Sequence, residues 1–366
     1  MTPLSILDLV PVSAGSTAAE AVRNTLDLAQ RAEALGYRRY WFAEHHLNPG
    51  VAGVDPAVVI ALTAAATERI RVGSAGVQLA HRTPLNTVEE FGLLDAAYPG
   101  RIDLGIGRSG PQLLKEHARR QPKTASSTTD SGLLIPASPA LRTQPPAFSL
   151  FGELLQQPGA QSPDYGTQIE QILALLDGTF TSTEGVPVQP VPGTGARPEL
   201  WILGASSGQS AAVAGKNGLR FAASYHIAPT TALDAVAAYR AAFQPSEFLD
   251  RPYVSVSADV VVAPTEAEAR ELAAGYALWV LGIRRGRGAQ PFPSPAEVAG
   301  HEWTEEDRAL VADRIDTQFV GTAAQVAERL RQLQRSAEAD ELVVTTITHA
   351  HADRVRSQEL LAAEWF

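Results

Sequence analysis

The 366-residue sequence contains no cysteine, which excludes disulfide bonds, thiolate catalysis, iron–sulfur clusters and cysteine-ligated zinc. It also lacks any run of about 18 apolar residues, the length that a membrane-spanning helix needs. Its N-terminus has neither the positively charged start nor the small-residue cleavage site of a secretory signal. We therefore expect a cytoplasmic protein with no membrane partner, whose chemistry uses histidines, carboxylates, hydroxyls or a cofactor.

Positive charge is in short supply. Thirty lysines and arginines stand against forty aspartates and glutamates, which gives a formal net charge of −10. An acidic chain repels a phosphate backbone unless its basic residues gather on one face. We therefore expect no nucleic acid partner.

Short apolar runs alternate with amphipathic helical segments along most of the chain. The helical segments carry start and stop signals, such as Asp55 before Pro56 and a final Gly36. Eight runs have the character of buried strands: "LSILDLV", "YRRYWFA", "RVGSAGVQL", "RIDLGIG", "ELWILGA", "LRFAAS", "YVSVSADVVVA" and "DELVVTTIT". Eight strand–helix units predict one α/β domain over residues 1–366, a TIM (β/α)8 barrel, with a doubly wound open sheet as the alternative.

This alternation breaks after residue 108. Residues 109–165 are rich in Pro, Ser, Thr and Gln and show little periodicity. A segment of this kind after the fourth strand is a long insertion, which we expect to be an active-site lid or partly disordered.

The second predicted strand runs into "WFAEHHLN", so Glu44, His45 and His46 lie at the carboxyl ends of the barrel strands. Active sites of TIM barrels lie at this end, which favours a functional role for these side chains. His349 and His351 in "THAHAD" follow the last strand and leave zinc as a minor alternative. We expect no metal site.

A candidate anion site lies on the neighbouring units. Small residues in "VGSAGV" and "GIGR" leave open space beside Arg108, which suits close approach of a flat ligand to the backbone. In "LGASSGQSAAVA" a strand ends at Gly204, and Ser206, Ser207 and Gly208 open a helix whose N–H groups and dipole suit a phosphate. Gly204 and Ala205 belong to the same candidate cofactor site. An anion site beside an open slot is what a mononucleotide cofactor needs.

These segments resemble the bacterial luciferase-like flavin-dependent monooxygenases, most closely their single-chain oxidoreductase branch. The resemblance covers nearly the whole chain outside the insertion. It implies a TIM barrel in which reduced FMN, delivered by a separate flavin reductase, reacts with molecular oxygen to form a flavin hydroperoxide that oxidises a small organic substrate. It also implies a homodimer, formed through the helices near the second and third strands. Its main segments are "AEALGYRRYWFAEHH", "ATERIRVGSAGVQL", "PLNTVEEFGLLDAAYPGRIDLGIGR" and "ILGASSGQSAAVAGKNGLRFAASYHIAP".

The resemblance assigns roles to several residues. His45 matches a histidine that acts as acid or base near the flavin, and the ordinary histidine pKa of about 6.5 suits proton exchange at neutral pH. A non-proline cis peptide bond is expected between Ala75 and Gly76, beside the isoalloxazine ring. Arg108 matches the arginine that holds the FMN phosphate, together with the two serines at the helix start.

Glu44 and His226 are expected on the substrate side. His226 follows the sixth strand in "SYHIAP", and a histidine that caps a helix before Pro229 is the alternative reading. The loop "LAHRTPL" departs from the family, because Arg82 stands where many relatives have a histidine and Ala80 where a proline is usual. Substrate contacts near that loop are therefore not transferred from the family.

Two other functions stay open. A sister branch of the same fold transfers hydride with a deazaflavin cofactor that has an acidic tail. Lys115, Arg119, Arg120 and Lys123 form a candidate clamp for this tail, and their alternative is a solvated helix face. The second alternative is a barrel that binds flavin but catalyses no reaction.

Overall fold

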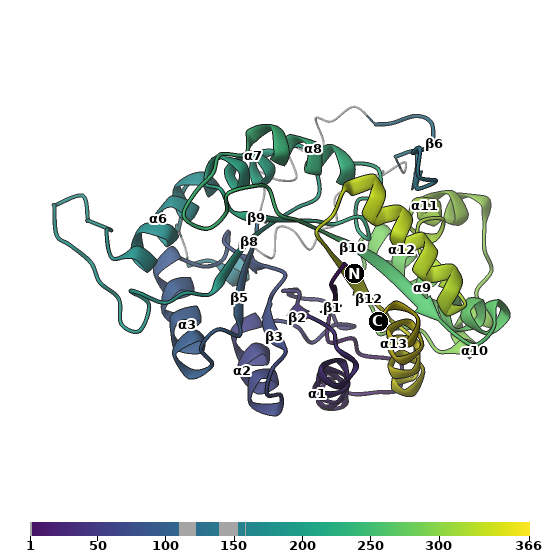
Figure 1. Cartoon of the computed structure of the whole chain (residues 1–366). Helices are drawn as coiled ribbons and strands as arrows, with labels where there is room; N and C mark the ends of the chain where they lie inside the picture. The colour runs from purple at the N-terminus through teal and green to yellow at the C-terminus, as the bar shows by residue number, and fades with distance from the viewer. Residues whose placement is uncertain (1, 110–121, 139–152, 158) are drawn as a thin grey trace.

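Eight parallel strands close into a barrel, whose arrangement can be followed in Figure 1. The computed structural model describes residues 2–109, 122–138, 153–157 and 159–366. The ring closes because β12 pairs with β1 on one side and with β10 on the other, and β10 also pairs with β9. This closure confirms the predicted TIM barrel and excludes an open sheet. The barrel strands are β1 (Leu4–Asp8), β2 (Arg39–Phe42), β3 (Arg71–Ser74), β5 (Ile102–Gly107), β8 (Glu199–Gly204), β9 (Arg220–Ala223), β10 (Val254–Val262) and β12 (Glu341–Thr345).

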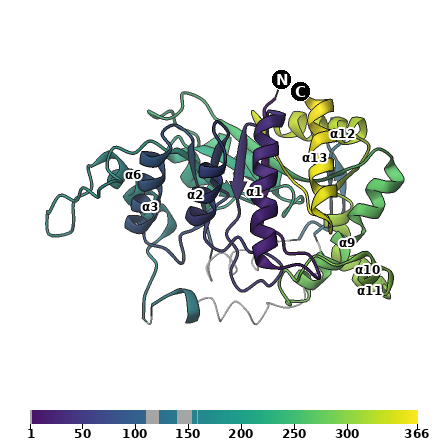
Figure 2. The same ribbon diagram turned by 90° about the horizontal axis from the view of Figure 1, so that it is seen from below.

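Helices cover the outside of the barrel. Thr17 and Glu20 form a capping box at the start of the first helix, which ends at Gly36 in the left-handed region, as its signals predict. Figure 2 shows this helix beside the last one, with both chain termini at the same end. Within the described ranges, no helix is both long and apolar enough to cross a bilayer. The outer helices are α1 (Ala18–Leu35), α2 (Pro56–Ala66), α3 (Pro84–Ala97), α6 (Tyr165–Asp177), α7 (Gln209–Lys216), α8 (Ala232–Ala242), α9 (Glu266–Arg284), α12 (Ala323–Ala337) and α13 (His351–Trp365).

Three local predictions differ from the structure. The third predicted strand is divided, because β3 ends at Ser74 and the short β4 (Val77–Gln78) resumes after the Ala75–Gly76 peptide. Helix α7 starts at Gln209 instead of Ser206, since its N-cap Gly208 has an extended backbone. Outside residues 109–165, three described elements were not predicted: α10 (Pro295–Ala299), α11 (Glu305–Ile315) and β11 (Phe319–Gly321).

Part of the insertion packs on the outer wall of the barrel. Its strands β6 (Ser127–Thr128) and β7 (Leu134–Ile135) form a small antiparallel hairpin. Tyr225 donates a hydrogen bond of 2.6 Å to the carbonyl of Leu134, and the hydroxyls of Thr129 and Ser336 of α12 lie 2.8 Å apart. The lid expected over residues 109–165 stays a prediction, since residues 110–121, 139–152 and 158 lie outside the described ranges.

A buried ion-pair layer closes the amino end of the barrel. Arg39, at the start of β2, is 2% exposed and donates from Nε to both carboxylate oxygens of Glu341 at 2.9 and 3.0 Å. Its Nη1 lies 2.8 Å from Asp103 and 2.9 Å from Glu199. Arg71 adds a further contact of 2.6 Å to Asp103. All five residues lie at or near the first position of their strands, so this layer joins five strands at the end opposite the cavity described below.

Candidate active site

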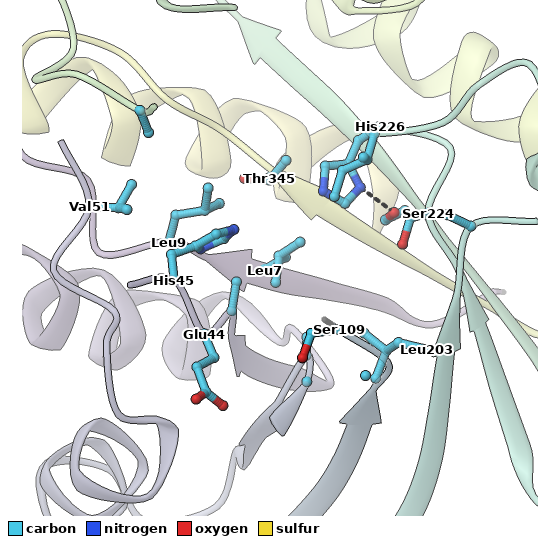
Figure 3. Close-up of a pocket in the computed structure, with 18 of the residues that line it drawn as sticks. Leu7, Leu9, Glu44, His45, Val51, Ser109, Leu203, Ser224, His226 and Thr345 are labelled. Carbon is cyan, nitrogen blue, oxygen red and sulfur yellow. Dashed lines mark hydrogen bonds between the residues drawn. The ribbon is translucent and has the colours of Figure 1, made fainter. Parts of the chain in front are cut away.

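A cavity of about 640 Å³ opens at the carboxyl ends of the barrel strands (Figure 3). Its floor includes Trp41, which packs edge-on against Trp201 with ring centres 4.9 Å apart. Ser207 is exposed and does not line this cavity. Every other residue that the sequence assigned to the site does line it: Glu44, His45, Ala75, Gly76, Arg108, Gly204, Ala205, Ser206 and His226.

His45 follows β2 on a short loop, which is held by the hydrogen bond of its backbone N–H to the carbonyl of Gly53 at 2.8 Å. Its Nδ1 is buried and has no hydrogen-bond partner in the described part of the chain. Burial lowers the pKa of His45 to about 4, although the carboxylate of Glu44 acts in the opposite direction. The ring is therefore neutral at neutral pH, which corrects the ordinary pKa assumed from the sequence.

The carboxylate of Glu44 points away from the His45 ring (Figure 3). It accepts hydrogen bonds from Nε2 of His46 at 2.8 Å and from the backbone N–H of Gln78 at 2.9 Å. The side chain of Gln78 donates in turn to the carbonyl of Glu44 at 2.6 Å. Glu44 thus ties the end of β2 to β4 and fixes the loop that carries His45.

Arg82, one of the two departures from the family pattern, is held by three carboxylates. It lies 2.8 Å from Glu90, 3.4 Å from Asp55 and 3.5 Å from Glu44. These contacts place its positive charge against protein groups beside the His45 loop, where it helps to offset the charge of Glu44.

Arg108 follows β5 and belongs to a chain of hydrogen bonds. Its Nη1 donates to Gln209 at 3.0 Å, and the Gln209 amide donates to Asp164 at 2.7 Å. The N-cap Gly208 offers no side-chain oxygen to the first turn of α7, so N–H groups of this turn stay available to an anion. Ser206 is buried in the turn just before. A guanidinium and an uncapped helix start therefore face the same side of the cavity.

The wall between Arg108 and His45 is made of backbone and small residues. The Ala75–Gly76 peptide bond is cis, as the family resemblance implied. A Cβ on Gly76 would lie 2.8 Å from the carbonyl oxygen of Gly105 and from Cδ1 of Leu203, so only glycine fits this position. At Gly107 the nearest atom to such a Cβ is 3.7 Å away. A planar group can approach this wall closely.

His226 faces His45 across the cavity (Figure 3), and its Nδ1 is hydrogen-bonded to the hydroxyl of Ser257. Its ring therefore lies in the cavity wall. Burial lowers the pKa of His226 to about 3, and the positive charge of Arg314 acts in the same direction. Both histidines of the site are neutral at neutral pH.

The sequence analysis missed a polar group beside His226. Asp259 on β10 accepts hydrogen bonds from the Tyr276 hydroxyl and from Arg314 of α11, and Arg314 also contacts that hydroxyl. Asp259 and Arg314 both line the cavity. The alternation of Ser255, Ser257 and Asp259 in "SVSADV" marks one inward face of the strand and could have revealed Asp259. Helix α11 was not predicted, so nothing pointed to Arg314.

The other candidate side chains lie elsewhere. His349 Nε2 is 3.1 Å from the carbonyl of Ala14, and His351 Nε2 is 2.8 Å from Asp27. Among the residues that the structure describes, no group of three or more His, Cys, Asp or Glu could hold a metal ion. Lys123 pairs with Asp234 at 3.1 Å outside the cavity. The other three residues of the predicted tail clamp, Lys115, Arg119 and Arg120, lie outside the described ranges.

The solved structures that share this fold include the following three. The structure of apo-MsnO8 has a TM-score of 0.76 and 30% sequence identity, and the match covers 100% of this chain and 97% of that one. The oxygenating constituent of 3,6-diketocamphane monooxygenase from Pseudomonas putida, solved with FMN, has a TM-score of 0.68 at 19% identity, with 100% and 97% covered. An F420-dependent secondary alcohol dehydrogenase has a TM-score of 0.62 at 12% identity, with 100% and 99% covered. The last two likenesses show the fold alone.

Sequence comparison gives the family. The family model described as luciferase-like monooxygenase matches residues 2–125 and 143–339. The Bacillus subtilis (strain 168) protein YvbT is 36% identical over 366 residues, covering 100% of this chain and 97% of its own length. A luciferase-like monooxygenase of Escherichia coli (strain K12) is 33% identical over 356 residues, covering 97% and 95%. The chain therefore belongs to the luciferase-like monooxygenase family.

Proposed function

We propose that this protein is a two-component monooxygenase that binds reduced FMN, supplied by a separate flavin reductase, and uses molecular oxygen to oxidise a small organic substrate. The observation that carries this proposal is one cavity that combines the Arg108 side, the small-residue wall and a neutral His45. The FMN complex of the fold-related diketocamphane monooxygenase supports this choice of cofactor.

The residues of the cavity fit FMN. The uncapped start of α7 and the guanidinium of Arg108 are the donor set that a phosphate monoester prefers. The wall at Ala75 and Gly76 carries no side chain larger than a methyl group, so a flat ring can lie against it. The buried Nδ1 of His45 lacks a partner among the described residues, so a polar group on a bound ring has a place to pair.

The protein's own residues would position the reactants and control protons. When bound, reduced FMN supplies the two electrons with which molecular oxygen is activated. Arg108 and the start of α7 would hold the phosphate, and the Ala75–Gly76 wall would accept the ring. His45, neutral because of burial, holds a proton on one ring nitrogen and accepts one on the other. Apolar side chains such as Leu7, Leu9 and Val51 exclude water from this space.

Deazaflavin-dependent hydride transfer is the alternative, and the F420-dependent dehydrogenase with the same fold is the observation in its favour. The sequence likeness to that enzyme is only 12%, against 33% to the luciferase-like monooxygenase of E. coli. Lys123, the described member of the predicted tail clamp, is already paired with Asp234. We therefore place monooxygenase chemistry first, ahead of both hydride transfer and a flavin-binding barrel without turnover.

Arg108→Ala is expected to raise the dissociation constant for FMN by about 100-fold, because it removes one partner of a charged, partly buried hydrogen-bonded contact. Riboflavin lacks the phosphate, so its affinity should change little. Fluorescence titration of both ligands measures this difference. Arg197→Ala, at an arginine that does not line the cavity, is the control. Equal FMN affinity in the Arg108 variant and the unmodified protein would refute the phosphate role.

We also propose that the protein forms a homodimer. Helix α2, "PAVVIALTAAA", contains no charged residue, and its Val58 and Leu62 are 57% and 46% exposed. On the neighbouring α3, Leu85 and Leu93 are 42% and 63% exposed. An apolar surface spread over two adjacent helices is typical of a protein–protein interface. We infer that α2 and α3 pack against the same helices of a second copy.

Leu62→Arg is expected to convert the dimer into a monomer. An interface between identical copies receives the new charge twice, and unpaired like charges there cost several kcal/mol. Analytical ultracentrifugation gives the mass in solution. Val186→Arg, at a valine that is 55% exposed outside these helices, should leave the dimer intact. A monomeric unmodified protein, or an unchanged dimer in the Leu62 variant, would contradict the proposed interface.

A further inference from the structure

The wall of the cavity opposite the Arg108 side carries a polar group that the proposed FMN contacts do not use. Asp259 is buried on the inward face of β10, and its Oδ2 accepts from Tyr276 and Arg314. Its other oxygen, Oδ1, accepts no hydrogen bond from any described residue. Since Asp259 lines the cavity, this oxygen is available to a ligand.

His226 presents a second acceptor. When the Ser257 hydroxyl donates to the carbonyl of Ala223, 3.3 Å away, Nδ1 of His226 carries the ring proton and donates to that hydroxyl. In a neutral ring the other nitrogen, Nε2, then has a free lone pair. His226 lines the cavity, and among the described residues no group donates to this nitrogen. The backbone N–H of His226 also bonds to the Ser257 carbonyl at 3.2 Å, which fixes the position of the residue.

Arg314 supplies the donors. The positive charge of the Arg314 guanidinium acts on His226 and lowers the pKa of that histidine. Only Nη2 contacts Asp259 and Tyr276, which leaves donor N–H groups beside the cavity. Nη1 is one of them, and it makes no hydrogen bond with any described residue. The side chain is 11% exposed, so this cation is held in place by protein and is not free in solvent.

The charges of this group select the kind of ligand. Arg314 and Asp259 offset each other, so the wall has no net charge to bind an ion. A carboxylate ligand would meet the negative charge of Asp259, and an ammonium would meet the positive charge of Arg314. A neutral hydroxyl both donates and accepts, so it can satisfy an acceptor and a donor of this wall at once. The cavity lining also includes large apolar side chains, among them Trp279, Ile283 and Ile347.

We propose that Asp259, Arg314 and His226 form a subsite that binds a hydroxyl group on an otherwise apolar substrate, such as a phenol or an alcohol. The proposal rests on the proposed function in one respect, namely that the cavity is where the substrate binds. Tyr276 positions the Asp259 carboxylate and the Arg314 guanidinium and does not itself line the cavity.

Three bicyclic probes of similar size test this subsite by calorimetric titration of the full-length protein, with and without FMN. 1-Naphthol should bind at least about tenfold more tightly than 1-methylnaphthalene, the factor that a hydrogen bond to a charged group contributes. 1-Naphthoate should bind more weakly than 1-naphthol. In Arg314→Gln and Asp259→Asn, the preference for 1-naphthol over 1-methylnaphthalene should fall to less than about twofold.

Arg284→Gln is the matched control, because Arg284 is 12% exposed and pairs with Asp313 at 2.7 Å but does not line the cavity. It should keep the full preference. Thermal unfolding shows that each variant is folded. Equal binding of 1-naphthol and 1-methylnaphthalene, failure of all probes to bind, tighter binding of 1-naphthoate, or an unchanged preference in both folded variants would overturn the subsite. These outcomes do not depend on FMN binding, whose loss would contradict the proposed function instead.

Discussion

Arg39→Ala is expected to lower the free energy of unfolding by about 3–5 kcal/mol, the cost of removing one partner from a buried ion pair. The carboxylates of Asp103 and Glu341 are fully buried, and each loses its contact with Arg39 at 2.8 and 2.9 Å. The guanidinium also lies 5.0 Å from the ring centre of Trp201, so packing is lost with the charge. Urea denaturation measured by circular dichroism gives this change.

Arg31→Ala provides the comparison at the surface. Arg31 pairs with Asp27 at 2.9 Å, but its side chain is 48% exposed, and exposed pairs contribute about 0–1 kcal/mol. If the Arg39 variant were as stable as the Arg31 variant, the ion-pair layer would not be what closes the amino end of the barrel.

His45→Ala is expected to lower the rate of substrate oxidation by about 100-fold or more, the contribution typical of a positioned acid–base group. The affinity for FMN should change by less than about threefold, because the phosphate contacts are assigned to Arg108 and the start of α7. His349→Ala, which removes a histidine that does not line the cavity, should keep full activity. Comparable losses in the two histidine variants would contradict a catalytic role for His45.

The pH dependence of the unmodified protein follows from the neutral ring. Burial lowers the pKa of His45 to about 4, so the neutral form is present above that value and is lost as the pH falls through it. The contribution of His45 to the rate should therefore be constant from neutral pH down to about pH 5. A rate that falls with an apparent pKa near the ordinary histidine value of about 6.5 would contradict this environment.

Much of the fold could be predicted because its signals are local. The capping box at Thr17 and Glu20 and the left-handed Gly36 mark the first helix, and Asp55 with Pro56 marks the second. Apolar runs between such signals are the buried strands of a parallel sheet. The predicted end of the third strand and the predicted start of α7 were less accurate. Both depend on backbone geometry at Gly76 and Gly208 that the sequence pattern does not specify.

The contacts that join distant strands could not be predicted. Arg39 meets Asp103, Glu199 and Glu341 only because the barrel closes, and no sequence spacing records this. The polar wall at Asp259 has the same origin, since Arg314 reaches it from a helix that the sequence analysis did not identify. The lowered pKa of His45 also arises from burial in the closed barrel. The residue types were enough to locate the site, but the surroundings of each side chain depend on how the chain folds.

The most direct test of the proposed monooxygenase is an anaerobic titration with reduced FMN and with reduced deazaflavin, followed by rapid mixing of each complex with oxygenated buffer. We expect reduced FMN to bind more tightly, to be reoxidised by oxygen while bound, and to lose affinity in Arg108→Ala. Tighter binding of the deazaflavin, with no reaction of its complex with oxygen, would contradict the account and assign the protein to hydride transfer.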